Sequence, residues 1–498
     1  MSEYVKLQNG SDVRGIAING VPSEEVNLRA HETFYLANSF AKWLSKKLNK
    51  DTNNLVVAIG YDSRLSSTDL KKGIFHGLLQ CRTTPIDCGI TSTPSTYMST
   101  RFEEIKADGA IMITASHLPF NKNGMKFFTQ EGGLNKNDIK EIITSIDESI
   151  PYAETEISIR SYPLVERYSK HIADLIRKGV NASNYEQPLL GMHIIVDAGN
   201  GAGGFFANYV LEALGADTRG SQFLDPDGRF PNHIPNPEDD EAIASVIHAT
   251  LTAKADLGII FDTDVDRAAV IDANGSAIHR NALIALMSAI TLEENPGSTI
   301  VTDSVTSDGL SVFIESLGGK HHRYKRGYKN VIDESIRLNE EGILSTLAIE
   351  TSGHGAFREN YFLDDGAYIV TKILIKLARL RQEGKEISDL ISTLIQPKDE
   401  VSLRAKIELS DFVDYGKKVL SDFSEYIHTK KEYSFVEPNY EGIRVNYDYE
   451  GTKGWVLVRM SLHDPVIPIN IESTTEGGCQ KAKEDLDHFL SKYEYLQY

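Results

Sequence analysis

The sequence predicts an α/β protein made of several domains. At 498 residues the chain is too long for one hydrophobic core, and usual domain sizes give about three or four domains. Three stretches share one plan, in which a β-branched apolar run ends in small polar residues and leads into a helical pattern: Leu55 to Arg64, Met192 to Gly204 and Ser298 to Asp308. Such strand, loop and helix units are typical of mixed α/β domains. Their identity is too low to establish a duplication by itself.

The order of these elements gives the expected domain boundaries. A linker helix is predicted from Leu164 to Lys178, because apolar residues recur there at helical spacing and Gly179 follows. Further boundaries are expected near Asn274-Gly275 and near Pro397, the latter after a helix with an apolar face. We therefore expect domains at residues 1–165, 166–278, 279–397 and 398–498.

The last domain has a different pattern. Apolar residues alternate from Val401 to Ile407, which predicts a half-buried strand. The segments Trp455 to Val458 and Ile467 to Ile471 predict a strand pair, and a helix is expected through Leu486 to Leu490. This part of the chain is predicted to be a small α+β domain.

The composition excludes several classes of protein. A content of 41% hydrophobic and 25% charged residues is ordinary for a soluble globular chain. The sequence has no apolar stretch of about 18 residues and no apolar secretory region near its start, so we expect a cytoplasmic protein that does not bind membranes. The net charge of −19 argues against binding to nucleic acid. Cys81, Cys88 and Cys479 have no metal-binding or disulfide spacing and are expected to be reduced thiols.

One segment predicts a serine that carries phosphate. Ser116 follows the apolar run Ala110 to Ile113, which is expected to be a buried strand. His117 beside it and Lys126 a short loop away are expected to be cationic donors of the kind that holds a phosphoryl group. Taken alone, the segment also fits an ordinary turn, since serine and Pro119 are common turn residues.

Three aspartates predict a metal site. Asp262, Asp264 and Asp266 alternate directly behind the apolar strand Leu257 to Phe261. Carboxylates at every second position of a tight loop can converge on one hard cation, and oxygen ligands suit Mg²⁺. An acidic solvated turn is the simpler interpretation, but three such charges repel one another without a cation.

Two other metal-dependent classes compete for these aspartates. An EF-hand loop needs Gly at its sixth position and Glu at its twelfth, where this chain has Arg267 and Ala273, so that class is excluded. A haloacid-dehalogenase-like phosphatase has the string Asp-x-Asp-x-Thr/Val, which Asp262 to Val265 matches, and its first aspartate is the nucleophile. That hypothesis leaves the Ser116 segment without a role.

The Ser116 segment resembles the active-site signature of the α-D-phosphohexomutases, which include phosphomannomutase, phosphoglucomutase and phosphoglucosamine mutase. The signature runs Ser-His-Asn-Pro, a spacer, Asn-Gly and Lys, and only Leu118 departs from it among Ser116 to Pro119. The aspartate loop is similar to the family's Asp-Gly-Asp-x-Asp-Arg, with Thr263 in place of glycine. Further motifs in the family's order extend the resemblance over nearly the whole chain.

Four further segments carry the resemblance. Glu350 to His354 is similar to the family's sugar-recognition loop, Glu-x-Ser-Gly-His, and Arg459 to Pro465 resembles its phosphate-binding loop. Leu462 and His463 depart from the second pattern. Weaker matches lie at Asp12 to Gly15 and Arg326 to Lys329.

Two other segments are expected to be structural. Gly60 to Arg64 is a further weak match to the family, and Arg64 is predicted to form a structural ion pair with Asp62. The proline-rich loop from Pro226 to Glu238, which is similar to one in relatives, is also expected to have a structural role.

The resemblance implies a fold and a set of site residues. The fold is four domains around a central cleft, three related α/β domains followed by the smaller α+β domain. The implied catalytic residues are Ser116, His117, Lys126, Arg14 and His354. The implied substrate-binding residues are Arg267, Lys329, Glu350, Ser352, Arg459, Ser461 and His463. The implied magnesium ligands are Ser116, Asp262, Asp264 and Asp266.

The resemblance also implies an activity. It is a phosphohexose mutase, an isomerase of carbohydrate metabolism that interconverts the 1-phosphate and 6-phosphate of glucose, mannose or both. The reaction is expected to pass through phosphorylated Ser116 and a hexose 1,6-bisphosphate, which is also the expected activator besides Mg²⁺. The expected partner is the phosphosugar, and the chain is expected to be a monomer or a small homo-oligomer.

Two alternatives to a mutase remain open at this point. The first is the magnesium-dependent phosphatase described above. The second is a catalytically silent sugar-phosphate binding protein, because Leu118, Thr263, Leu462 and His463 depart from the family pattern. The choice among glucose, mannose and glucosamine phosphates is also left open by the sequence.

Overall fold

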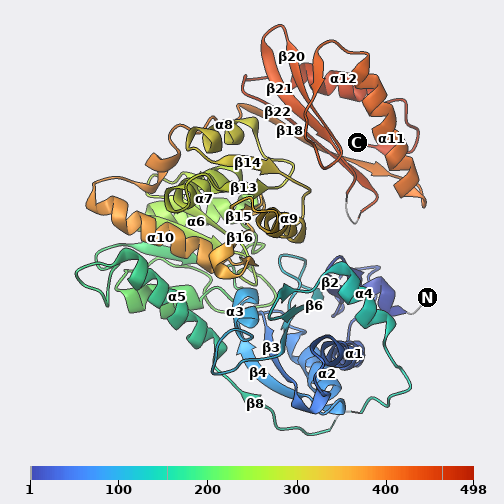
Figure 1. Ribbon diagram of the computed structural model, residues 1–498, viewed down its shortest axis with the longest axis vertical. Helices are drawn as coiled ribbons and strands as arrows, with labels where there is room; N and C mark the ends of the chain where they lie inside the picture. The colour runs from blue at the N-terminus through green and yellow to red at the C-terminus, as the bar shows by residue number, and fades with distance from the viewer. Residues whose placement is uncertain (1–2, 154, 462–463) are drawn as a thin grey trace. The chain divides into compact units, whose positions relative to one another are not determined.

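The computed structural model describes residues 3–153, 155–461 and 464–498, and the chain divides into two compact units (Figure 1). The first unit comprises Met1–Leu283 and Ser352–Asp389, and the second comprises Ile284–Thr351 and Leu390–Tyr498. The predicted linker helix is present in the first unit as α5 (Leu164–Val180), where it packs against α10 (Gly366–Gln382).

The N-terminal sheet of the first unit has parallel and antiparallel strands in the order β1-β2-β6-β5-β3-β4-β8, with β7 paired to β6. Its strands are β1 (Gln8–Asn9), β2 (Asp12–Ile16), β3 (Val56–Tyr61), β4 (Thr84–Ile90), β5 (Gly109–Ile113), β6 (Lys122–Thr129), β7 (Gly132–Gly133) and β8 (Arg160–Ser161). Its helices are η1 (Glu3–Leu7), α1 (Ala30–Leu48), η2 (Thr52–Asn54), α2 (Ser67–Gln80), α3 (Thr93–Met98) and α4 (Lys136–Thr144).

Close packing of α1 on α2 explains one glycine of this domain. A Cβ atom at Gly73 of α2 would lie 2.0 Å from the Ala30 carbonyl oxygen at the start of α1. Only glycine permits that approach, and it brings the apolar faces of both helices onto the sheet. Phe34, Phe40 and Ile74 are buried in the resulting core.

The pairing of β5 with β6 places Lys126 near the predicted serine loop. All of β5 is buried, as the apolar run predicted, and the strand ends at Ile113. β6 runs antiparallel to β5, with Met112 opposite Lys126 and Ile113 opposite Met125. Lys126 therefore lies beside the end of β5, the strand that precedes Ser116.

A second sheet of the first unit supplies the aspartate loop. Its order is β12-β11-β10-β9, with β9 (Ile194–Asp197) parallel to β10 (Leu257–Phe261). β10 and β11 (Ala268–Asp272) are antiparallel, and β12 (Ala277–Ile278) pairs with β11. The loop 262–267 is thus the short connection between two central, fully buried strands.

Short helices and one strand pair complete the first unit. The segment after β9 is a π-helix, η3 (Phe206–Leu211), followed by η4 (Glu212–Leu214), in place of a regular α-helix. The other elements are α6 (Asp240–Ala253), β16 (Gly355–Phe357), η5 (Arg358–Asn360) and β17 (Leu363–Asp364), with β16 and β17 antiparallel. α7 (Arg280–Glu294) and η6 (Ile387–Ile391) extend across the division between the two units.

The second unit contains a parallel α/β part and the C-terminal α+β part. In the former, β13 (Thr299–Thr302) lies between β14 (Lys320–Arg323) and β15 (Ser345–Ile349), with helices α8 (Asp308–Ser316) and α9 (Tyr328–Glu340). Strand β13, the loop after it and helix α8 confirm the strand, loop and helix unit predicted to begin in the stretch Ser298 to Asp308.

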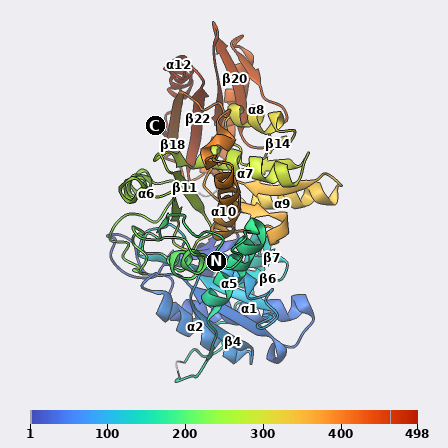
Figure 2. The ribbon, with the colours of Figure 1, turned by 90° about the vertical axis from the view of Figure 1, so that its left-hand side faces the viewer.

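The C-terminal sheet has the order β19-β20-β21-β22-β18-β23, with all neighbours antiparallel. Its elements are β18 (Asp399–Ile407), α11 (Phe412–His428), β19 (Tyr433–Phe435), β20 (Ile443–Tyr449), β21 (Thr452–Val458), β22 (Val466–Ser473), α12 (Gln480–Leu490) and β23 (Leu496–Gln497). Helices α11 and α12 pack on one face of the sheet (Figure 2). The predicted strand pair β21–β22 and the terminal helix are confirmed.

Two smaller expectations can also be compared with the structure. Cys81, Cys88 and Cys479 are free thiols, as predicted, and all three are buried. Among the helices that the structure describes, none is both long and apolar enough to cross a membrane.

Candidate active site

Ser116 lies in the loop after β5, within hydrogen-bond distance of the aspartate loop. Its Oγ donates to Asp262 Oδ2 at 3.1 Å and accepts from the Arg267 guanidinium at 3.2 Å. Its backbone has φ +51°, a left-handed conformation that non-glycine residues rarely adopt. The backbone N–H donates to Thr114 Oγ1 at 2.8 Å, which helps to hold this turn. The structure thus joins the two segments that the sequence singled out independently.

The three aspartates converge as the sequence predicted. Asp262, Asp264 and Asp266 are buried, and each offers a carboxylate oxygen within 4.8 Å of the other two. Val265 between them has φ +63°, although a β-branched residue is an outlier in that region. Such strained backbone is typical of functional loops, where neighbouring structure imposes it. Here the Gly366 N–H donates to the Val265 carbonyl at 3.0 Å and helps to fix the loop.

Two buried cations neutralise part of this acidic charge. Lys126 Nζ donates to Asp264 Oδ2 at 3.1 Å and also to Asp266 Oδ2. Arg267, which is 1% exposed, bonds to Asp262 through Nε at 3.1 Å. Burial lowers the pKa of each cation, but the adjacent aspartates raise it by more, so that both stay charged.

The carboxylates themselves have opposed pKa shifts. Burial and the negative charge of Asp266 raise the pKa of Asp262 well above its usual range. Burial also acts on Asp266, but Lys126 and His354 hold its pKa well below the usual range. The repulsion between these neighbouring carboxylates is one cause of the raised pKa of Asp262, and a bound cation would relieve it.

The donor set fits a magnesium ion. Within the part of the chain that the structure describes, Asp264 Oδ1 is buried and has no hydrogen-bond partner. A buried carboxylate oxygen without a partner is costly, and a bound cation would remove that cost. The site contains oxygen donors and no sulfur, which suits Mg²⁺ better than softer metals. Asp262, Asp264 and Asp266 are the residues that can hold the ion.

His117 differs from the cationic donor that was expected. His117 Nδ1 lies 2.7 Å from the Arg267 guanidinium, and because arginine only donates, this nitrogen accepts. Partial loss of hydration and the charge of Arg267 lower the pKa of His117, so its ring is neutral near pH 7. The prediction of a cationic His117 is therefore wrong, while its place beside Ser116 is as expected.

His354 links Ser352 of the predicted sugar-recognition loop to the aspartate loop. Its Nε2 lies 3.5 Å from Asp266 Oδ1, and its Nδ1 lies 2.9 Å from Ser352 Oγ. Burial lowers the pKa of His354 although Asp266 opposes that effect. Both His354 and Ser352 thus belong to the same cluster as the metal loop.

Arg14 and Arg64 are bound to the strand ends around this cluster. Arg14 donates to Asp12 Oδ2 at 2.8 Å and to the Thr114 carbonyl two residues before Ser116. Arg64 Nε lies 3.4 Å from Asp62 Oδ2 and both side chains are fully buried, which confirms the predicted ion pair.

A second cluster lies in the second unit, around Glu441. This residue accepts from the Arg326 backbone N–H at 3.1 Å and from Ser304 Oγ, and its other oxygen lies 3.8 Å from Arg459. Glu350 Oε1 accepts from the Gly327 N–H at 2.6 Å, beside Arg326. Segment 326–327 therefore contacts Glu350 of the predicted sugar-recognition loop directly, while Glu441 links it to Arg459 of the predicted phosphate-binding loop.

The remaining predicted residues are placed less centrally. Lys329 pairs with Asp333 on its own helix at 2.9 Å. Ser461 Oγ accepts from the Asp464 N–H at 3.2 Å. His463 and Leu462 lie outside the described residues.

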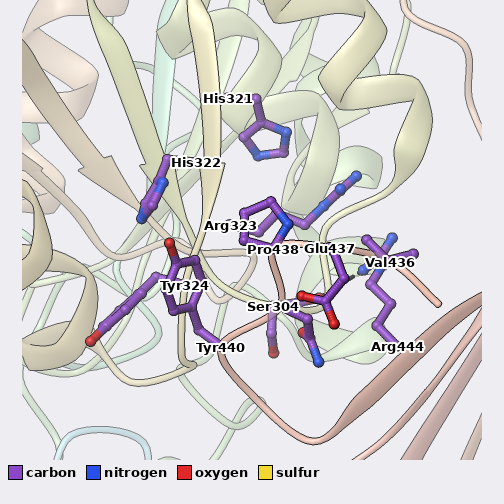
Figure 3. Close-up of a pocket in the computed structure, with 11 residues that line it drawn as sticks. Ser304, His321, His322, Arg323, Tyr324, Val436, Glu437, Pro438, Tyr440 and Arg444 are labelled. Carbon is purple, nitrogen blue, oxygen red and sulfur yellow. Dashed lines mark hydrogen bonds between the residues drawn. The ribbon is translucent and has the colours of Figure 1, made fainter.

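A cavity of about 140 Å³ adjoins the Glu441 cluster (Figure 3). His322, Tyr324 and Tyr440 form one side of it, with the Tyr440 ring 5.0 Å from Tyr324 and 5.2 Å from His322. Arg444 lines the other side and donates to the Ser304 carbonyl at 2.8 Å. This bond fixes the loop after β13, which carries Ser304, to strand β20.

Comparisons with known proteins give matches along most of the chain. Domain families described as phosphoglucomutase/phosphomannomutase, alpha/beta/alpha domains I, II and III, match residues 6–153, 166–275 and 279–397. A phosphoglucomutase/phosphomannomutase of Thermococcus kodakarensis is 31% identical over 436 residues, which are 87% of this chain and 88% of that protein.

The chain belongs to the phosphoglucomutase/phosphomannomutase family.

Other relatives are also similar to this chain over most of their length. The Pseudomonas aeruginosa phosphomannomutase/phosphoglucomutase is 29% identical over 450 residues, 89% of each chain. A phosphoglucomutase/phosphomannomutase family protein of Burkholderia thailandensis superposes with a TM-score of 0.78 at 25% identity, over 99% of this chain and 98% of that one.

Membership in this phosphoglucomutase/phosphomannomutase family confirms the predicted enzyme class and the predicted fold. The chain is an enzyme of the intramolecular phosphotransferase class, an isomerase of carbohydrate metabolism. It has three α/β domains followed by a C-terminal α+β domain.

Several residues of the site were not predicted from the sequence. Thr93 donates to Asp264 Oδ2 through its hydroxyl and to the Asp264 carbonyl through its N–H, at 2.8 Å for the latter. Ser92-Thr93-Pro94 is a typical helix start. This pattern could have placed Thr93 in the turn between a strand and the following helix. Asn236 accepts from Arg267 at 3.2 Å, although its loop was expected to be only structural. No motif in the sequence around Glu441 indicated a place in the site.

Proposed function

We propose that this enzyme interconverts hexose 1-phosphate and hexose 6-phosphate, of glucose, mannose or both, through phosphorylated Ser116 and a hexose 1,6-bisphosphate. One observation carries the proposal, the contact of Ser116 Oγ with both Asp262 and Arg267. The Ser116 hydroxyl therefore lies next to the three carboxylates that can hold a cation and next to the buried guanidinium of Arg267. Both features stabilise the charge of a phosphoryl group during transfer.

The phosphoryl group moves between two oxygens in this proposal. The bond from phosphorus to Ser116 Oγ breaks as a bond forms to a sugar hydroxyl, whose proton leaves to a base. His354, which lies beside Asp266 and Ser352, is the proposed acceptor. In the second half the bisphosphate returns its other phosphate to Ser116, which regenerates the enzyme.

The buried charges of the first unit support this step. A magnesium ion held by the three aspartates, with Ser116 as a further ligand, would act as a Lewis acid toward the phosphoryl oxygens. Arg267 has one N–H bonded to Ser116 Oγ and is therefore oriented toward the transferred group. Lys126 and Arg14 hold the acidic loop and the Thr114 carbonyl in place.

The second cluster supports binding of the substrate's own phosphate. Arg459 is 7% exposed, and its guanidinium lies 3.8 Å from Glu441. Its guanidinium can take a phosphate in bidentate fashion, with Ser461, Lys329 and His463 proposed as further contacts. Glu350 and Ser352 are proposed to bind the sugar hydroxyls, because carboxylate and hydroxyl oxygens match them in hydrogen-bonding capacity.

A coupled assay tests the proposal. Glucose 1-phosphate and mannose 1-phosphate are supplied with Mg²⁺ and a trace of hexose 1,6-bisphosphate, and formation of 6-phosphate is measured. We expect turnover by the native enzyme and none by Ser116→Ala. Ser145→Ala is the matched control, because Ser145 is exposed and bonds only to its own helix.

The same assay separates the alternatives. A phosphatase with Asp262 as nucleophile would release inorganic phosphate and would keep its turnover in Ser116→Ala. A silent binding protein would form neither product. Either result would overturn the proposed mutase.

A further inference from the structure

Arg64 bonds to the main chain of the Ser116 loop in a way that its ion pair with Asp62 does not explain. Its side chain is fully buried and its two terminal nitrogens donate to four backbone carbonyls. The acceptors are Ser116 and Leu118, each at 2.5 Å, and Pro119 and Lys122, each at 2.8 Å. One side chain thus satisfies carbonyls along the whole loop between β5 and β6.

The loop needs such a partner because its own hydrogen bonds are few. Within it the Leu118 N–H donates to the Ala115 carbonyl at 3.1 Å and the Lys122 N–H to the Pro119 carbonyl at 3.0 Å. Buried carbonyl oxygens without donors are costly, and Pro119 has no N–H to offer. A planar guanidinium with five N–H groups can serve several carbonyls at once, which a lysine ammonium on a flexible stem cannot do with the same geometry.

A loop of the second domain holds Arg64 from the other side. The Phe230 ring centroid lies 5.3 Å from Arg64 Cζ, within the range of a cation–π contact. A Cβ atom at Gly228 would lie 2.5 Å from the Leu65 nitrogen and 2.8 Å from Arg64 Cα. The absence of a side chain at Gly228 therefore allows this loop to lie directly on the backbone of Arg64.

We infer that Arg64 is a positioning residue for the phosphoryl transfer, and that Gly228 and Phe230 hold it in that role. By fixing the carbonyls of residues 116, 118, 119 and 122, Arg64 sets the left-handed turn at Ser116 and so the direction of Ser116 Oγ toward Asp262. The inference rests on the proposed function and gives a role to the loop that was expected only to be structural.

Steady-state kinetics test the role in catalysis. Arg64→Lys keeps the charge but not the planar donor set, and we expect kcat to fall about 100-fold while KM changes less than about threefold, since a shift of about 1 Å at a reacting group costs that much. Arg229→Lys is the matched control, because Arg229 lies on the same covering loop but its side chain is 73% exposed and pairs with Asp227. In Arg64→Ala, millimolar guanidinium is expected to restore part of kcat, and ammonium is not.

Amide hydrogen exchange tests the structural part independently of turnover. In Arg64→Lys we expect faster exchange in peptides that cover residues 114–123, with unchanged exchange in the core strand β10. Gly228→Ala is a second variant that keeps the arginine, and we expect the same local change with a smaller fall in kcat.

Two results would overturn the inference. One is native exchange in the 114–123 peptides together with native kcat in Arg64→Lys. The other is exchange that rises equally in all peptides, which would make Arg64 a general stabilising residue. If the native enzyme has no mutase turnover, the proposed function fails, and the exchange measurement still decides whether Arg64 fixes the loop.

Discussion

The two charged clusters of this enzyme differ in how their charges are balanced. In the first unit, Asp262, Asp264 and Asp266 contact Lys126 or Arg267, and all five side chains are almost completely buried. In the second unit, the Arg459 guanidinium lies 3.8 Å from Glu441 and the Arg326 guanidinium lies 3.9 Å from Asp303, and the Arg326 side chain is 33% exposed.

This difference indicates different tasks. The first cluster has an excess of acid, little solvent and a backbone fixed in left-handed turns at Ser116 and Val265. Such a site is organised in advance for charge that develops during a reaction. In the second cluster each arginine has one carboxylate partner at a longer distance, 3.8 Å or 3.9 Å, and an incoming anion can replace such a partner. Substitutions in the first cluster should therefore lower kcat, and those in the second should change KM.

The largest effect is expected from Asp264→Asn. This change keeps the shape of the side chain but removes one of three charges that favour the cation, so we expect kcat to fall by about 10³-fold. Thermal unfolding measured with Mg²⁺ and with EDTA provides a second readout. Mg²⁺ should raise the Tm of the native enzyme but not that of Asp264→Asn. Equal Mg²⁺ stabilisation of both proteins would contradict a metal site at Asp264.

A smaller effect of opposite sign is expected from Glu441→Gln. The change removes the negative charge beside Arg459 and keeps an oxygen for the Arg326 N–H, so a sugar phosphate should bind more tightly. We expect KM to fall threefold to tenfold, which corresponds to about 1 kcal/mol, with kcat little changed. Glu437→Gln, four residues before Glu441 in the sequence, is the control. A rise in KM would show that Glu441 positions Arg459 for the substrate instead of competing with it.

The smallest effect concerns stability rather than activity and involves Glu472 of β22. Burial raises the pKa of this carboxyl from 4.5 to about 7 in the folded protein, although the charge of Arg444 opposes the shift. Between these values the folded state keeps a proton that the unfolded state has lost, so the free energy of unfolding falls as pH rises. The loss is at most about 3 kcal/mol between pH 4.5 and 7.

Urea unfolding at pH 5 and pH 8 measures this dependence. We expect Glu472→Gln to be less sensitive to pH than the native enzyme, with the difference largest at pH 8. Glu476→Gln, at an exposed position of the following turn, should behave like the native protein. An unchanged pH dependence in Glu472→Gln would mean that this carboxyl does not hold its proton in the folded state.

Features encoded by local pattern could be predicted from the sequence. The apolar runs before Ser116 and Asp262 gave β5 and β10, and the alternation after residue 400 gave β18. The spacing of the aspartates predicted their convergence, because alternate residues of a tight loop share one side. These are consequences of chain geometry within a few residues.

Features that depend on tertiary contacts could not be predicted. The four carbonyls bound by Arg64 lie more than 50 residues away along the chain, as the separations of 52 to 58 residues show. His117 was expected to be a cation, but Arg267, 150 residues further on, makes its Nδ1 an acceptor. Glu441 has no motif around it, and its role follows only from the proximity of Ser304 and Arg326.

The central claim is that Ser116 carries the phosphoryl group, and labelling tests it most directly. The enzyme is incubated with hexose 1,6-bisphosphate labelled in its phosphates and with Mg²⁺, then quenched, digested and mapped by mass spectrometry. We expect one phosphate, on Ser116, which is lost when excess hexose 1-phosphate is added before the quench. Label on Asp262, or no label on any residue while 6-phosphate is still formed, would contradict it.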